Sequence, residues 1–428
     1  MARRLRAVVV LTGSELVRGD KPDANGAFLA RELTRLGLEP VRIVVVGDDA
    51  DELQAAVREG LQADVCVLSG GLGPTHDDRT VETLAREAGR PLRVDEGLER
   101  EIEAVSRGVA ERLGRPYADF VPGVRKQASL PDGAVSLGLA GTAPAVLVER
   151  DGRVAVALPG PPAELRRLWP RVVESGQFGR VVARAERPRH TVLRLFGPSE
   201  SAVARVLEEE GGEGGGLDVT VCAQDLEIRV DLLARGDGEE RAGRVAAALR
   251  ERFESELFAE DERTVGEIVL ARCRELGLRL ATAESCTGGL VGARLTDVAG
   301  ASEAYAGGVV AYSDDLKTRL LGVPGETLER HGAVSAETAR AMADGARAAL
   351  GADVAVAVTG VAGPGGGTPE KPVGLVYVHA AAPEGEEARE LRIPGDREAV
   401  RARATAISLH TLRRLLTRSG TDARDSSG

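Results

Sequence analysis

The sequence predicts an α/β protein with parallel sheets at its two ends and a small α+β segment between them. Short β-branched runs alternate with amphipathic stretches of helical period, which is typical of βαβ units. Glycine-rich segments follow directly on several of these runs, as ligand-binding loops do at the carboxyl ends of parallel strands. The 428 residues are 43% hydrophobic and 29% charged, so two or three domains can each bury a core.

We expect residues 1–172 to form the first domain, because β-branched runs and amphipathic stretches alternate throughout it. The predicted strands are Ala7–Leu11, Val41–Val46, Val65–Ser69, Ala145–Val148 and Val154–Leu158. The predicted helices between them are Ala24–Leu36, Asp51–Leu61 and Thr80–Ala88. This order predicts an α/β domain around a largely parallel sheet.

Residues 173–260 have a different texture and predict a small two-layer α+β domain. The predicted order is strand His190–Phe196, helix Ser199–Glu210, two strands within Leu217–Ala234 and helix Glu239–Phe253. The glycine-rich stretch Gly211–Gly216 is expected to be an exposed, flexible loop. No motif in this segment suggests chemistry.

Residues 261–418 return to the α/β pattern and are expected to form a third domain. The predicted strands are Leu278–Ala283, Gly307–Tyr312, Val354–Val358 and Gly374–Ala380, and the outermost helices are Val265–Leu276 and Asp396–Leu416. The polar tail, 419–428, is expected to be disordered.

Charge and composition exclude several classes of function. With 67 acidic against 56 basic residues, the net charge of −11 argues against direct nucleic-acid binding. The five histidines are scattered without zinc-ligand spacing, and the four cysteines form no CxxC pair. No apolar run is long enough for a membrane helix. We therefore expect a cytoplasmic protein with reduced thiols and no contact with a membrane.

Polar and glycine-rich loops follow three strands of the first domain. The longest, 69–80, begins with Gly70, Gly71 and Gly73, whose backbone amides could approach a phosphate closely. Asp78 and Thr80 could hold a cation or a water beside that phosphate, or could simply cap the following helix. The sequences TGSEL at 12–16, with DAN at 23–25 beyond it, and GDD at 47–49 lie at two further strand ends. Together these acidic loops suggest a metal–phosphate site.

This part of the chain resembles the molybdopterin-binding domain of molybdenum-cofactor enzymes and, more closely, the N-terminal domain of the competence/damage-inducible CinA family. GSEL, DAN, VGDD, GGLGPTHDDRT, GTAPA and LPGPP carry the likeness. The resemblance implies a molybdopterin-binding-like three-layer fold and Mg²⁺-assisted attack of water on the pyrophosphate of ADP-ribose. The residues implied for the metal are Asp48, Asp77 and Asp78, and those for substrate are Glu15, Asn25, Gly70, Gly71, Gly73 and Thr80. A domain that only binds a nucleotide or pterin and regulates, or a partner module in DNA uptake, is the alternative.

The third segment carries a denser set of motifs. Its first strand runs into Glu284, Ser285, Cys286, Thr287, Gly288 and Gly289, ahead of a helix. Hydroxyl and amide groups at a helix start suit a phosphate, although Ser285 or Thr287 could merely cap that helix. The glycine-rich loop 359–367 begins with Thr359, Gly360 and Gly363 and could hold an oxyanion, or could be a plain crossover.

Ser302, Tyr312 and Lys317 fall within one short segment and could form a catalytic set. A desolvated lysine loses its charge more readily and can take a proton from a serine hydroxyl. Taken singly, each has a structural alternative as a loop cap, a half-buried aromatic residue or a solvated charge.

This segment resembles the nicotinamide-nucleotide amidase family, the C-terminal part of CinA proteins. TAESCTGG, GAS, VVAYSDDLK, HGAVS, VTGVAGPGGGTPEKPVG and PGDREAVR follow the family's order over about 150 residues. The resemblance identifies the whole chain as a member of the CinA family, implies a KOW-like middle module, and implies that nicotinamide mononucleotide is hydrolysed to nicotinate mononucleotide and ammonia without a cofactor.

Roles for single residues follow from the same resemblance. It implies Ser302 as nucleophile, Lys317 as its base, Tyr312 as a proton relay and Thr359 as an oxyanion or substrate contact, with Arg397 supporting the site. Ser285 is the rival nucleophile; we favour Ser302 because it shares its local segment with Tyr312 and Lys317. The resemblance also implies a homodimer, with small-molecule nucleotides as the partners of both sites.

Overall fold

The computed structural model describes residues 4–425 of the chain, and the side chains of that range up to residue 418. The chain divides into two compact units, Met1–Arg189 and His190–Gly428, and each is described by itself. The middle and last sequence segments therefore belong to one unit. The expected boundary at residue 172 falls inside helix α7 (Pro162–Glu174), which together with α8 (Gly176–Val182) packs into the first unit.

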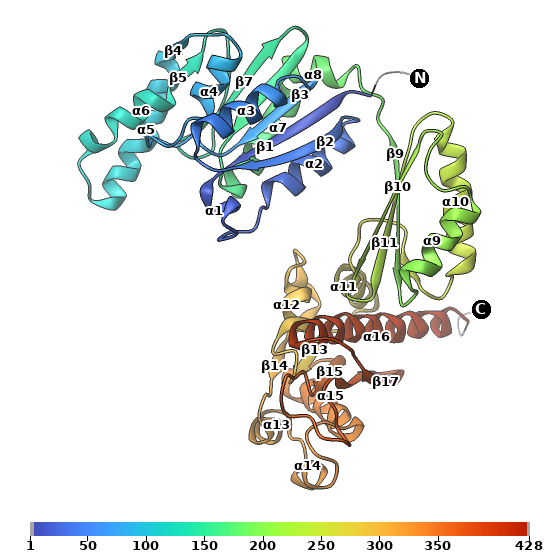
Figure 1. Cartoon of the computed structure of the whole chain (residues 1–428). Helices are drawn as coiled ribbons and strands as arrows, with labels where there is room; N and C mark the ends of the chain where they lie inside the picture. Colours follow the sequence, from blue (N-terminus) through green and yellow to red (C-terminus); the bar gives the residue numbers. More distant parts are fainter. Residues whose placement is uncertain (1–3, 426–428) are drawn as a thin grey trace. The chain divides into compact units, whose positions relative to one another are not determined.

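The first unit is built on a six-stranded sheet with the order β2-β1-β3-β8-β7-β6 (Figure 1). The strands are β1 (Arg6–Thr12), β2 (Glu39–Val46), β3 (Val65–Ser69), β6 (Val135–Leu139), β7 (Pro144–Arg150) and β8 (Arg153–Leu158). The first four strands in the sheet order run parallel to one another. β7 pairs antiparallel with β8, and β6 pairs antiparallel with β7. All five predicted strands of this segment are confirmed.

Helices cover both faces of this sheet, which gives the expected three layers. Leu29, Leu165 and Trp169 lie in the core on one face, and Leu53, Leu84 and Ile102 in the core on the other. The helices are α1 (Ser14–Val17), α2 (Asn25–Arg35), α3 (Ala50–Gly60), α4 (Thr80–Glu87), α5 (Glu96–Leu113), η1 (Tyr117–Asp119) and α6 (Val121–Gln127), besides α7 and α8. A two-stranded ribbon consists of β4 (Leu92–Val94) and β5 (Ser129–Pro131).

The second unit begins with a four-stranded sheet of order β10-β11-β9-β12. Its elements are β9 (Arg189–Phe196), α9 (Glu200–Glu209), β10 (Leu217–Gln224), β11 (Glu227–Ala234), α10 (Gly238–Arg252) and β12 (Leu257–Ala259). The core includes Leu195 and Leu232 from the strands and Val203 and Leu249 from the helices. This is the predicted α+β arrangement, with β12 added by an apolar run too short to be recognised.

The rest of the second unit forms a five-stranded sheet of order β14-β13-β15-β16-β17. The strands are β13 (Leu280–Glu284), β14 (Tyr305–Val310), β15 (Val354–Gly360), β16 (Leu375–Ala382) and β17 (Gly385–Arg392). β14, β13 and β15 are parallel to one another. β16 pairs antiparallel with β15, and β17 pairs antiparallel with β16. The helices are α11 (Val265–Leu276), α12 (Leu290–Thr296), η2 (Ala301–Glu303), α13 (Asp314–Leu321), α14 (Gly325–His331), α15 (Ala336–Leu350) and α16 (Arg397–Asp425).

Two sequence predictions for this region were incomplete. Strand β17 was not predicted, because most of its residues are charged and it lacks the apolar run of the other strands. Helix α16 continues to Asp425, so the expected disordered tail, 419–428, is helical as far as Asp425, and 426–428 lie outside the described residues.

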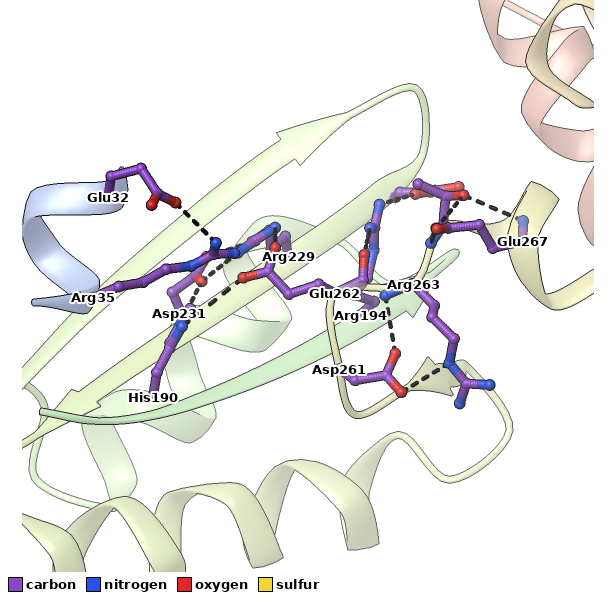
Figure 2. A network of polar contacts seen from close by, with 12 residues as sticks. Glu32, Arg35, His190, Arg194, Arg229, Asp231, Asp261, Glu262, Arg263 and Glu267 are labelled. Atoms are coloured by element: carbon purple, nitrogen blue, oxygen red, sulfur yellow. Dashed lines mark hydrogen bonds and ion pairs between the residues drawn. The ribbon is translucent and has the colours of Figure 1, made fainter. Parts of the chain in front are cut away.

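Buried polar and aromatic contacts join the two parts of the second unit. His410 of α16 stacks on Phe196 of β9, with ring centroids 3.7 Å apart, and its Nε2 lies 2.9 Å from Glu227 of β11. Figure 2 shows a more exposed network beside it, in which His190 and Arg229 converge on Asp231. Burial alone would raise the pKa of Asp231, but the hydrogen bonds with these two residues lower it to about 2.

Between residues 4 and 425, no helix combines the length and apolar character that a bilayer crossing needs.

The buried His410 predicts a pH-dependent stability of the second unit. Burial lowers its pKa from 6.5 to about 4, so the folded chain binds this proton more weakly than the unfolded chain does. The contribution of His410 to the free energy of unfolding is fully present above pH 6.5. It is lost as the pH falls towards 4, by on the order of 3 kcal/mol. We expect urea midpoints of the second unit to show this loss, and His410→Gln to flatten it. His331→Gln, at a partly exposed histidine, should leave it unchanged; an unaltered profile in His410→Gln contradicts the prediction.

Candidate functional site

A cavity of about 670 Å³ opens at the carboxyl ends of the parallel strands in the first unit. Loops that follow β1, β2, β3 and β8 all contribute to it, as expected for an open α/β sheet. The predicted residues Glu15, Asn25, Asp48, Gly70, Gly71, Gly73, Asp77 and Asp78 all line it. The structure therefore brings together three loops that are far apart in the sequence.

The glycines of the 70–73 loop are required by its backbone. Gly70 and Gly71 have positive φ values of 100° and 64°, and a Cβ on Gly70 would lie 2.4 Å from the Thr12 carbonyl oxygen. Thr80 is fully buried and donates a hydrogen bond of 2.8 Å to the Gly70 carbonyl. Contrary to its prediction as a substrate contact, Thr80 holds the loop from beneath.

The carboxylates of the cavity do not form a preassembled metal centre. Asp78 accepts hydrogen bonds from the amide and hydroxyl of Thr75, and Asp48 accepts one from the Ser14 hydroxyl. Within the described range, no group of three or more His, Cys, Asp or Glu side chains gathers as metal ligands do. Mg²⁺ is commonly held by one or two carboxylates together with substrate phosphates. The residues present thus fit a cation that is shared with a phosphorylated ligand rather than a resident one.

Two buried polar atoms in this cavity lack a hydrogen-bonding partner in the described part of the chain. They are Oγ1 of Thr12 and Oδ1 of Asn25, in residues that are only 9% and 8% exposed. The amide nitrogen of Asn25 is already bound to Ser69 Oγ and to the Gly160 carbonyl, which fixes the side chain. Because an unsatisfied buried polar group is costly, these atoms point to a polar ligand.

Sequence reasoning missed several residues of this cavity. Thr12 was quoted within a motif but given no role, although it is the last residue of β1. Glu164, whose pKa is raised by burial, follows the LPGPP motif and was not selected. The other missed polar side chains are Lys21, Asp23, Gln127 and Thr142.

At the corresponding edge of the second unit, a buried glutamate organises the loop between β13 and α12. Glu284 is 1% exposed, and its carboxylate accepts hydrogen bonds of 2.7 to 3.1 Å from the Thr287 hydroxyl and three backbone amides. Those amides belong to Gly289, Val291 and Gly292 at the start of α12.

This geometry corrects a sequence prediction. Glu284, Ser285, Thr287, Gly288 and Gly289 were expected to hold a ligand phosphate at the helix start. Instead the Glu284 carboxylate occupies that position as an internal anion and uses the donors a phosphate would need. The glycines serve the backbone, since Gly288 and Gly289 both have positive φ values.

Lys317 lies buried at this edge. Its side chain is 2% exposed, with Asp314 Oδ1 3.6 Å from its Nζ. Burial lowers the pKa of Lys317, and Asp314 partly opposes that shift. Cys286 and Tyr312 are both close enough to act on the same pKa, which places Lys317 beside the ends of β13 and β14. Tyr312, just after β14, and Lys317 in α13 thus lie at the same end of the sheet.

Arg397 connects two further loops of this edge. It donates one hydrogen bond of 2.8 Å to the Tyr312 hydroxyl and another of 2.8 Å to the Gly363 carbonyl. Gly360 ends β15. Thr359 is buried and its hydroxyl donates to the Ala333 carbonyl, so it positions the 331–335 loop rather than offering a proton to an oxyanion.

Two serines were candidates for the nucleophile. The structure places them at opposite ends of the parallel strands. Ser285 directly follows β13, at the edge that holds Lys317 and Tyr312. Ser302 lies in η2, before β14, where the Ala304 carbonyl accepts a hydrogen bond from Leu280, the first residue of β13. The six residues of β14 separate Ser302 from Tyr312 by roughly 20 Å. The expectation that these residues meet within one chain is therefore wrong, because nearness in sequence spans a whole strand.

The geometry also settles which thiol chemistry is open to the site. Cys286 is buried, and burial raises the pKa of its thiol to about 12. A thiol of this kind stays protonated and does not act as a nucleophile.

Comparison with known proteins places the chain in a family. Residues 262–416 match the CinA C-terminal domain, and residues 8–176 match a probable molybdopterin binding domain. A CinA-like protein from Mycolicibacterium gilvum is 43% identical over 424 residues, which cover 97% of this chain and 99% of that protein. The chain belongs to the CinA family. CinA-like proteins from Mycobacterium sp. (strain MCS) and Mycobacterium tuberculosis are 43% and 40% identical over similar lengths.

Solved structures of CinA-family proteins cover part of the chain. The competence/damage inducible protein CihA from Agrobacterium tumefaciens is 41% identical over 37% of this chain and 99% of its own, with a TM-score of 0.35. A CinA protein from Thermoplasma acidophilum is 36% identical over 39% of this chain and 95% of its own, also with a TM-score of 0.35.

Proposed function

We propose that the second unit is an amidohydrolase that converts nicotinamide mononucleotide to nicotinate mononucleotide and ammonia. The observation that carries this proposal is the buried Lys317 beside Tyr312, at the strand ends where α/β sheets bind ligands. An amine with a lowered pKa is available in its neutral form, which is the form that accepts a proton. Membership of the CinA family is consistent with this assignment.

The reaction proceeds through an ester with a serine. The serine oxygen forms a bond to the carboxamide carbon while its proton moves to the Lys317 amine. Lys317 then donates that proton to the amide nitrogen, the carbon–nitrogen bond breaks, and ammonia leaves. Water attacks the ester carbon, its proton passes through Lys317 to the serine oxygen, and nicotinate mononucleotide is released. Of the two candidate serines, Ser285 lies at this end of the strands, whereas Ser302 lies before β14 at the other end.

Arg397 is suited to recognise the nucleotide phosphate. Its guanidinium is exposed and is fixed in place by the Tyr312 hydroxyl and the Gly363 carbonyl. Fixed arginines bind phosphate strongly because the hydrogen bonds are assisted by charge. This assignment replaces the helix start of α12, which Glu284 already fills.

Replacement of the lysine tests the proposed reaction. We expect Lys317→Met to lower kcat for ammonia release on the order of 1000-fold, because the substitution removes the buried amine that takes the serine proton. The fold should persist, since an apolar side chain of similar length replaces a buried cation. Arg319→Met, at an exposed position of the same helix, should retain full activity. Wild-type rates in Lys317→Met would exclude Lys317 as the base.

The pH profile provides a separate test. Only neutral Lys317 is active, so the rate should rise with pH through the pKa of Lys317, below the ordinary lysine value of 10.5. Asp314 raises that pKa, so Asp314→Asn should move the rising limb to lower pH. Asp315→Asn removes a carboxylate that pairs with Arg319 instead and should not shift the limb. A shift to higher pH in Asp314→Asn contradicts the assignment.

For the first unit we propose metal-dependent hydrolysis of the pyrophosphate of ADP-ribose. Six carboxylates and one lysine line its cavity, namely Glu15, Asp23, Asp48, Asp77, Asp78, Glu164 and Lys21. So acidic a cavity repels a pyrophosphate unless a cation accompanies it, which supports a role for a divalent ion such as Mg²⁺. Asp48 and Asp78 would hold that ion, which would neutralise phosphate charge and activate water. Thr12 and Asn25 supply the buried polar atoms that fix the nucleotide.

Formation of AMP and ribose 5-phosphate from ADP-ribose with Mg²⁺ tests this second activity. We expect Asp78→Asn to slow it about 100-fold, since a metal-binding carboxylate contributes several kcal/mol to such reactions. The amide can still accept the Thr75 hydrogen bonds, so the loop should keep its shape. Asp119→Asn, at an exposed position in η1, is the matched control. Wild-type protein that binds ADP-ribose without cleaving it would instead support a regulatory, non-catalytic domain.

A further inference from the structure

A groove of about 450 Å³ adjoins the cavity of the first unit, and no step of the proposed reaction uses it. Helix α5, the turn between β6 and β7, and the start of α7 form its walls. Thr142 and Glu164 line both the cavity and the groove, so the two spaces meet at these side chains. A ligand whose phosphates bind at the 70–73 loop therefore has room to extend into the groove.

The walls of this groove combine apolar side chains with arginines. Val105, Val109 and Arg112 recur at intervals of four and three residues, so they share one face of α5. Val105 is 37% exposed, which is unusual for a valine on a helix that otherwise presents charges to solvent. Arg167 lines the groove from α7, and its guanidinium donates a hydrogen bond of 3.4 Å to the Ala140 carbonyl. Apolar side chains beside a fixed guanidinium suit the packing of an aromatic base.

Glu164 lies where the groove meets the cavity, and its carboxylate has free hydrogen-bonding capacity. It is half-buried in the first turn of α7, and burial raises its pKa. Among the residues that the structure describes, none donates a hydrogen bond to this carboxylate. Asp48 and Asp78 of the same cavity, in contrast, accept hydrogen bonds from Ser14 and Thr75. A carboxylate that has lost part of its hydration is stabilised by donors, so a ligand with hydroxyl groups would bind here favourably.

Gly141 allows the Glu164 carboxylate to take this position. It belongs to the turn between β6 and β7, and a Cβ on it would lie 2.6 Å from Oε1 of Glu164. Any side chain at residue 141 would therefore displace the carboxylate. The absence of a side chain in the turn and the carboxylate packed against it together define the opening between cavity and groove.

We propose that this groove is a nucleoside subsite, in which Glu164 accepts hydrogen bonds from the ribose hydroxyls of the AMP half of ADP-ribose and the adenine packs on Val105 and Val109. A carboxylate complements a vicinal diol, because it only accepts hydrogen bonds and the two hydroxyls donate them. Dinucleotide-binding folds use an acidic residue for a ribose hydroxyl in the same way. The negative charge of Glu164 keeps phosphates away from this position, so they remain at the glycine loop. This inference rests on the pyrophosphatase function proposed for the first unit.

Calorimetric titration of the two products, AMP and ribose 5-phosphate, into the full-length protein with Mg²⁺ separates the halves of the substrate. We expect Glu164→Gln to weaken AMP binding about tenfold, because hydrogen bonds to a charged acceptor are lost. Val109→Glu, which places a charge in the groove, should weaken AMP binding at least as much. Neither substitution should change the affinity for ribose 5-phosphate. The matched controls are Glu174→Gln at the end of α7 and Val121→Glu in α6, both at exposed positions.

Removal of a hydroxyl from the ligand tests the ribose contact itself. Wild-type protein should bind 2′-deoxy-AMP about tenfold more weakly than AMP, whereas Glu164→Gln should bind the two nearly alike, because the acceptor is already gone. Gly141→Ala, which displaces the carboxylate, should behave like Glu164→Gln. Equal affinity of the wild type for the two ligands would overturn the proposal, and so would unchanged AMP binding in Val109→Glu. Loss of ribose 5-phosphate binding alone would place the other half of the substrate in the groove and would also overturn it.

The subsite and the reaction can fail separately. Wild-type protein that binds AMP with the expected dependence on Glu164 but does not cleave ADP-ribose would support the subsite and exclude the pyrophosphatase. Cleavage with wild-type KM in both Glu164→Gln and Val109→Glu would support the reaction and overturn the subsite. Wild-type protein that binds neither product would overturn both. Urea midpoints check the fold of each variant, and Glu164→Gln should keep the wild-type midpoint because it breaks no hydrogen bond in the described part of the chain.

Discussion

The arrangement of the candidate site in the second unit depends on one buried carboxylate. Glu284 ends a fully buried strand, and its two oxygens accept four hydrogen bonds from the loop and helix that follow. A carboxylate with 1% exposure would be very costly without these donors, so the loop must adopt the one shape that supplies them. Arg401 adds to this constraint from α16 by donating to the Cys286 and Thr287 carbonyls. The position of Cys286 beside Lys317 follows from the same constraint.

Much of the fold can be predicted from the sequence because the strands are short, apolar and bounded by glycines. Val65–Ser69 and Val265–Leu276 were predicted with their observed bounds, since polar or glycine residues mark both ends. β17 was not predicted because most of its side chains are charged. Its pairing with β16, which the local sequence does not reveal, stabilises it as a strand. The boundary at Arg189 escaped because α8 contributes Phe178 to the core of the first unit, which no local pattern reveals.

The candidate sites show the same division between local and tertiary information. Loops at strand ends were found correctly, since the position of a glycine after a strand is local. The hydrogen-bonding partner of a donor, in contrast, depends on the tertiary structure and cannot be found from the neighbouring sequence. The Thr80 and Thr359 hydroxyls are used by backbone carbonyls, and the amides of α12 are used by Glu284. A glutamate at the end of an apolar strand just before a glycine-rich helix start was the available signal, because burial of such a charge requires donors nearby.

The separation of Ser302 from Lys317 follows from the parallel pairing of β14 with β13. A parallel strand returns to the same edge, so residues before and after β14 must lie at opposite ends of it. Of the two candidate serines, Ser285 directly follows β13 and therefore shares its end of the sheet with Lys317, whereas Ser302 lies at the other end.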